Sequence, residues 1–331
     1  MTVRTWSTPT TSGDVTVIEI AHPDIRVELL SLGAAIRQVE VPDRSGSLGP
    51  VHLALPEVAD YADRALNPHL GATLGRYANR IAGGTLDLDG TTYRLDVNNG
   101  PNTLHGGALG WDRHVWRVAD VDDSAEAVTV TFALTSPNGD MGFPGTVSAL
   151  ATYSVTGTAI ALHFSASTDA LTVISMANHG YWNLAGTDSI AGHELRVAAE
   201  QRLAMDDHQI PCAVADIAMT PYDLRVPVDL GPIIAQTGGL DDCYVIDGEG
   251  LREAAELRCP SNGRRMKVMT DAPGVQVYTG NNLKPPFAVH QSVSLETQRM
   301  PDAPNQPALG PCILRPGEEY RSTTLLEFGV D

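Results

Sequence analysis

Apolar and polar residues alternate along most of the chain with the two-residue period of β-strands. Gly, Pro, Asn and Asp separate the alternating segments, and Asp89-Gly90 is a dipeptide typical of tight hairpins. The expected strands are Val15–Ile20, Ile25–Leu30, Ala34–Val41, Leu86–Leu88, Thr92–Leu95, Val115–Ala119, Val128–Leu134, Thr146–Val155, Ala159–Ser167, Leu195–Ala198, Cys243–Ile246, Ala255–Arg258, Met266–Thr270, Gln276–Tyr278, Val293–Thr297 and Thr323–Phe328.

Helical character is confined to two short segments, Glu57–Arg64 and Pro232–Thr237. Strands this frequent, without intervening helices of about 10–15 residues, exclude a doubly wound α/β fold. We therefore predict an all-β protein, a large antiparallel β-sandwich with few short helices. Because no linker, charge block or fixed-period repeat divides the sequence, residues 1–331 are expected to form one domain.

The charge and composition of the chain limit the kinds of ligand that it is expected to bind and the compartment in which it is expected to lie. The chain has 22 basic and 40 acidic side chains, a net charge of −18, which disfavours nucleic acid and anionic membranes and suits a neutral small ligand. No segment approaches ~18 consecutive apolar residues and the N-terminus lacks a signal-peptide pattern, so we expect a cytoplasmic protein that does not span a membrane. The widely spaced Cys212, Cys243, Cys259 and Cys312 are expected to be reduced and structural.

The segment Ser292–Asn305 combines a strand with a candidate catalytic carboxylate. Val293 and Leu295 share one face of the predicted strand and Glu296 lies on the other, polar face. Pro, Asp and Asn end the strand shortly afterwards, so the pattern predicts a half-buried strand that opens into an irregular loop. A carboxylate on a rigid strand at the rim of a sheet suits a general base. An exposed glutamate without a function is the alternative.

The glycine-rich segment Gly71–Gly84 contains Arg76, Asn79 and Arg80. It matches neither the P-loop nor the dinucleotide-binding motif. Its amide and guanidinium groups could donate to sugar hydroxyls or to a developing oxyanion. Arginines that only stabilise a loop are the alternative.

Two histidines stand beside glycines in segments that suit a binding site. His105 precedes Gly106-Gly107, and His179 is followed by Gly180 and by Tyr181-Trp182. Aromatic rings stack on the apolar faces of sugars while neighbouring polar groups bind the hydroxyls. A histidine that caps a turn and a satisfied core histidine remain equally compatible with these patterns.

Adjacent carboxylates enter a later strand at Asp241 and Asp242, and alternation allows only one of them to face a pocket.

No histidine or cysteine pair has the spacing of a metal site, although His105, His179 and Glu296 could meet in space as a two-histidine carboxylate set. We expect neither a metal nor a cofactor. A G-x-S-x-G nucleophile motif is absent from the sequence.

Taken together and in this order, six segments resemble the aldose 1-epimerase (galactose mutarotase) family from about Val15 to Phe328. They are GRYANRIAGG, NNGPNTLHGG with the following GWDRHVW, NHGYWNLAG, LDD, VQVYTGN and LETQRMPDAPN. The resemblance implies the mutarotase-like β-sandwich and interconversion of the α and β anomers of a free aldose such as galactose or glucose, without a cofactor. By motif, Glu296 is the general base and His179 the general acid. The implied sugar contacts are Asn79, Arg80, His105, Asp241 and Gln276.

Two positions depart from the family pattern. Tyr181-Trp182 stands where Tyr-Phe is common, and Asp242-Cys243 follows Asp241 where His-Asn is usual, so the sugar preference could differ. One alternative is a hexose-6-phosphate 1-epimerase, for which Arg76 and Arg80 are the candidate phosphate ligands. Another is a non-catalytic sugar-binding protein. The expected partner is a monosaccharide, and the protein is expected to be a monomer or a homodimer.

Overall fold

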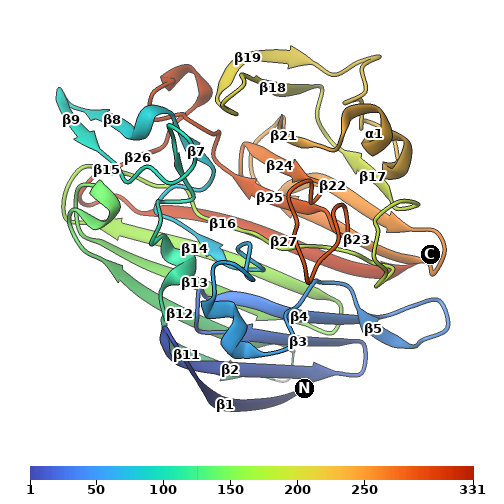
Figure 1. The fold of residues 1–331 in the computed structure, drawn as a ribbon. Coiled ribbons are helices and arrows are strands. Elements are labelled where there is room, and N and C mark those ends of the chain that lie inside the picture. The colour runs from blue at the N-terminus through green and yellow to red at the C-terminus, as the bar shows by residue number, and fades with distance from the viewer. Residues whose placement is uncertain (125) are drawn as a thin grey trace.

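A computed structural model describes residues 1–124 and 126–331 and consists mostly of antiparallel β-sheet (Figure 1). The N-terminal sheet has its five strands in chain order. They are β1 (Thr2–Thr10), β2 (Gly13–His22), β3 (Ile25–Leu30), β4 (Ala35–Pro42) and β5 (Leu48–Pro50).

The largest sheet has nine strands, and the C-terminal strand lies inside it between two segments distant in sequence. Its spatial order is β11 (Arg117–Asp123), β12 (Val128–Ser136), β13 (Val147–Val155), β14 (Ala159–Thr168), β27 (Tyr320–Val330), β23 (Arg264–Thr270), β22 (Arg252–Cys259), β17 (Glu194–Val197) and β20 (Val228–Asp229). Because β27 pairs with both β14 and β23, it joins β11–β14 to the later strands β23, β22, β17 and β20 in one continuous sheet.

A third sheet of five strands carries much of the candidate site. Its order is β19 (Pro211–Asp216), β18 (Gln201–Met205), β21 (Asp241–Val245), β24 (Gly274–Tyr278) and β25 (Ser294–Gln298). Short two-stranded pairs tie down the long loops beside it. These are β6 (Thr73–Leu74) with β16 (Ala177–Asn178), β7 (Arg80–Ile81) with β10 (Thr103–Leu104), β8 (Thr85–Leu88) with β9 (Thr91–Arg94), and β15 (Thr172–Val173) with β26 (Ile313–Leu314).

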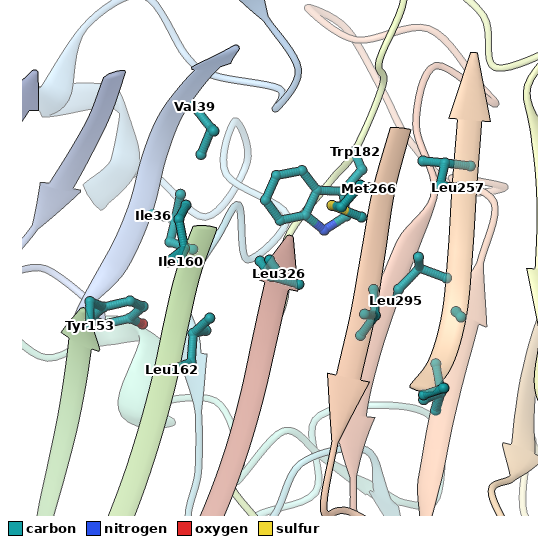
Figure 2. Packing of buried hydrophobic residues seen from close by; sticks show 14 of the residues in the cluster. Ile36, Val39, Tyr153, Ile160, Leu162, Trp182, Leu257, Met266, Leu295 and Leu326 are labelled. Carbon is teal, nitrogen blue, oxygen red and sulfur yellow. The ribbon is translucent and has the colours of Figure 1, made fainter. Parts of the chain in front are cut away.

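The principal hydrophobic cluster draws side chains from all three large sheets (Figure 2). Ile36 of β4, Ile160 of β14, Leu326 of β27 and Leu295 of β25 belong to it, together with Trp182. Each is at most 5% exposed. This burial provides the main favourable free energy of folding, and it anchors the strands that present the candidate site.

The predicted all-β class and the antiparallel strand arrangement are confirmed. The first predicted helical segment is a 3₁₀ helix, Val58–Ala62, and the second is the α-helix α1, Leu230–Thr237. Among the described residues, no helix has the length and apolar character needed to cross a membrane. The single-domain organisation of residues 1–331 stays a prediction.

Two sequence expectations are wrong. The strand around Glu296 is buried on both faces rather than on one, since Glu296 is 2% and Leu295 5% exposed. The core covers one face, and the loops around the candidate site cover the polar one. The four cysteines are free thiols, as expected, but the expectation that all four are structural does not hold for Cys212, which is exposed on β19.

Candidate active site

All seven residues that the family resemblance implied for the site line one cavity of about 210 Å³. They come from positions 79 to 296, so the fold brings together segments that are distant in sequence. The cavity wall contains Asn79, Arg80, His105, His179, Asp241, Gln276 and Glu296.

Cross-strand pairing in β21, β24 and β25 places four of the cavity side chains next to one another. Gln276 of β24 lies directly opposite Glu296 of β25, and Tyr278 pairs with Asp241 of β21 in the neighbouring row. Residues two apart share a face of a strand, so these four side chains point the same way. The Nε2 amide of Gln276 donates to Oδ1 of Asp241 at 2.7 Å, and this bond orients both groups toward the cavity.

Asp242 points away from the cavity, as alternation requires. Its Oδ1 accepts a hydrogen bond from Arg202 at 2.7 Å. Only one of the two adjacent carboxylates therefore reaches the site, which confirms that expectation.

Two loops meet where β7 pairs with β10. Asn79 precedes β7 and His105 follows β10, and both have left-handed backbone conformations, with φ values of 64° and 51°. The backbone N–H of Asn79 donates to Nδ1 of His105 at 3.1 Å. A Cβ on Gly106 would lie 2.1 Å from the Gly75 carbonyl oxygen, so this close approach of the loops requires glycine. Because Nδ1 of His105 accepts the backbone N–H of Asn79, the neutral ring carries its proton on Nε2 and presents a donor there.

Of the two arginines considered as phosphate ligands, only Arg80 lines the cavity. Its Nε donates to Oδ1 of Asn99 at 3.0 Å. Arg76 is 2% exposed, and its guanidinium donates to carbonyl oxygens that include those of Pro144 and Gly145. The expectation that Arg76 could bind phosphate is wrong, because backbone oxygens already occupy its donors.

Four aromatic rings surround the imidazole of His179. Tyr181 and His69 stack on it with interplanar angles of 16°, at centroid distances of 4.7 and 5.8 Å. His105 and Tyr278 approach at 77° and 84°. This packing fixes the ring plane of His179.

The fixed ring points at the candidate base. Nε2 of His179 lies 3.6 Å from Oε1 of Glu296, and Oγ of Ser294 lies 3.4 Å from Nδ1 on the other side of the ring. The second carboxylate oxygen, Oε2 of Glu296, is buried without a hydrogen-bond partner in the described structure. A sugar hydroxyl that enters the cavity could satisfy it.

Burial sets the proton affinities of this pair. It raises the pKa of Glu296 well above its usual value, and the negative charge of Asp241 raises it further, while Arg80 opposes the shift. Burial lowers the pKa of His179 to about 3, with His69 contributing. His179 is therefore neutral near pH 7, which disfavours an imidazolium donor and leaves a neutral Nε2–H donor. The carboxyl group is a stronger base than an ordinary glutamate.

His105, His179 and Glu296 do meet in space, with one potential ligand atom of each within 4.8 Å of the others. Histidines that bind metals normally donate their second ring N–H to an acceptor. Nδ1 of His105 does the reverse, since it accepts from the Asn79 backbone. This hydrogen bond favours a substrate-facing donor over a metal ligand.

Sequence reasoning missed His69, Asn99, Asn282 and Leu283, which also line the cavity. His69 has no local signal, because its partner Asp112 is 43 residues away. Asn282 follows the predicted strand at Gln276–Tyr278 by only a few residues, so its place at the rim could have been anticipated.

Comparisons with known proteins identify the family of the chain. A family model described as aldose 1-epimerase matches residues 16–327. The chain is 37% identical to a galactose mutarotase of Bos taurus, with 97% of this chain and 96% of the relative covered. It is 34% identical to an aldose 1-epimerase of Escherichia coli (strain K12), with 91% of each covered.

Solved structures give the same result. A GalM/aldose epimerase homologue from C. elegans has a TM-score of 0.88 and 28% identity, with 95% of this chain and 98% of that chain covered. A galactose 1-epimerase from Lactobacillus acidophilus has a TM-score of 0.87 and 25% identity, with 99% of each covered. The chain belongs to the aldose 1-epimerase family.

Proposed function

We propose that Glu296 is the general base and His179 the proton donor with which this aldose 1-epimerase interconverts the α and β anomers of a free aldose. The observation that carries the assignment is the pairing of the two groups in the cavity, with Nε2 of His179 3.6 Å from Oε1 of Glu296.

The proton steps balance without a cofactor. Ionised Glu296 takes the proton of the C1 hydroxyl, and the electron pair of that O–H bond forms the aldehyde C=O. The C1–O5 bond breaks toward O5, which receives the Nε2 proton of His179. After rotation about C1–C2, the reverse steps close the ring on the other face and return both protein groups to their starting states.

The other cavity residues suit binding and charge stabilisation. His105 and Arg80 present N–H donors that would steady negative charge on oxygen during ring opening. Asp241 and Gln276, already joined by a hydrogen bond, offer oxygens to sugar hydroxyls. Asn79 also lines the cavity, and because its Oδ1 accepts from the backbone N–H of Arg80, its side-chain N–H groups would be the ones offered to a hydroxyl. The relatives named galactose mutarotase make galactose the first substrate to try.

Polarimetry of freshly dissolved α-D-galactose and α-D-glucose tests the assignment. Glu296→Gln preserves the shape of the side chain and removes the base, so turnover should fall by about 10²–10⁴-fold while the sugar still binds. Glu249→Gln changes an exposed glutamate and serves as the matched control. Near-wild-type turnover by Glu296→Gln would rule out this base.

The same assay addresses the alternatives. With a non-catalytic sugar-binding protein, the optical rotation of both sugars would reach equilibrium no faster than in buffer alone. The alternative of a hexose-6-phosphate 1-epimerase required Arg76 and Arg80 as phosphate ligands. Arg76 is not available for this role, because its guanidinium already donates to the carbonyl oxygens of Pro144 and Gly145. The cytoplasmic location and the choice between monomer and homodimer stay predictions.

A further inference from the structure

His69 lines the cavity, and its backbone is strained. Its φ of 70° lies in the left-handed region that residues other than glycine seldom adopt. The side chain is 17% exposed. Residues held in such conformations persist where the surrounding structure requires them, and they concentrate at functional sites.

Both ring nitrogens of His69 have partners. Nδ1 lies 2.8 Å from Oδ2 of the buried Asp112, and Nη1 of Arg64 lies 3.2 Å from Nε2. A guanidinium can only donate, so Nε2 accepts and the proton resides on Nδ1, which donates to Asp112. Arg64 is itself anchored through Nη2 to the carbonyl oxygen of Ala108 at 2.8 Å. The ring of His69 is therefore held in one orientation and in one tautomer.

The face of this ring rests on His179. The two imidazoles are nearly parallel, at 16°, with centroids 5.8 Å apart. With no free nitrogen, His69 is suited neither to proton transfer nor to donating to a sugar hydroxyl. It offers a flat surface whose position is set by Asp112 and Arg64.

We propose that His69 is a positioning residue that holds the imidazole of His179 in the plane required for proton transfer to the ring oxygen. This inference rests on the proposed role of His179. Displacing a reacting group by about 1 Å can lower a rate by about 10²-fold. Loss of the His69 ring should therefore slow the chemical step without weakening sugar binding.

Three substitutions at position 69 separate the ring from its hydrogen bonds. His69→Ala removes both. His69→Asn tolerates the left-handed backbone and retains a donor for Asp112, but it has no ring. His69→Phe restores a flat ring without a hydrogen bond. His163→Ala, an exposed histidine on β14, is the control.

The expected result is a loss of about tenfold in kcat for the alanine and asparagine variants, with KM within about twofold of wild type and most of the loss recovered by phenylalanine. Wild-type kcat in His69→Asn would overturn the proposal, as would a rise in KM at unchanged kcat, which marks a sugar contact. A phenylalanine variant that folds but is as slow as alanine would also overturn it. Should phenylalanine fail to fold, the asparagine variant decides alone.

Glu296→Gln is measured in parallel to distinguish the two hypotheses. If that variant keeps its turnover, the proposed function fails whatever position 69 does. If it loses turnover while His69→Asn retains wild-type kcat, only the positioning role fails.

Discussion

Arg76→Lys tests whether the arginine of the glycine-rich segment is structural. Nη1 of Arg76 donates to Pro144 O at 2.6 Å, to Gly145 O at 2.8 Å and to Thr172 Oγ1 at 3.4 Å. Nη2 donates to Ser136 O at 3.2 Å, to Ser136 Oγ at 2.6 Å and to Pro137 O at 3.0 Å. A lysine ammonium has three donors at one point, so it can replace only one arm of this fork.

The size of the effect follows from the three acceptors left behind. Most of these acceptors are buried, and each lost hydrogen bond is worth about 1–1.5 kcal/mol net, so the free energy of unfolding should fall by roughly 3–5 kcal/mol. That is a large part of the ~5–15 kcal/mol typical of folded proteins. Activity of the folded fraction at 25 °C should stay near wild type, because Arg76 does not line the cavity.

Urea denaturation measures this loss. With a slope of about 3 kcal/mol per molar urea, the midpoint should fall by roughly 1–2 M. Arg4→Lys, whose side chain is 79% exposed, is the matched control and should shift the midpoint little. A loss below ~1 kcal/mol for Arg76→Lys, or a selective loss of binding to a sugar phosphate, would refute the structural role.

Two further predictions concern the carboxyl group of Glu296. Because its pKa is raised, the ionised base is lost as the pH falls through a value above the ordinary 4.5; kcat/KM should decline there, and Asp241→Asn should move the decline to lower pH by removing a repelling charge. A pH–rate profile that does not move would contradict this origin of the shift. The same raised pKa means that ionised Glu296 destabilises the fold at neutral pH, since folding favours its protonated form. Glu296→Gln should therefore increase the unfolding midpoint in urea at pH 7–8 but not near pH 4, and a lower midpoint at pH 7–8 would contradict it.

Strand positions were predictable because alternation of side chains is a local property. β13, for example, spans Val147–Val155 with every second residue buried, as the pattern required. Whether other segments bury the polar face of a strand depends on residues that are distant in sequence. The polar face of β25 looked solvent-exposed, but it is buried beneath loops that also hold His105 and His179.

The same distinction divides the candidate site. The nominated residues lie in short segments whose composition stands out, such as the glycines beside His105. Arg76 shares such a segment, but the oxygens that surround it come from residues 60 to 96 positions away. The contact between His69 and Asp112 depends likewise on how two loops pack, and no periodicity encodes it.

The pairing of Gln276 with Glu296 restricts how this protein can change in evolution. Inserting or deleting one residue within β25 would turn Glu296 to the opposite face and bring a neighbour such as Leu295 or Thr297 into its place. The loops before β7 and after β10 follow no such parity, and their positions are set instead by the Asn79–His105 hydrogen bond and by the close approach of Gly106 to the Gly75 carbonyl. An insertion or deletion in β25 that keeps Glu296 facing the cavity must therefore involve an even number of residues.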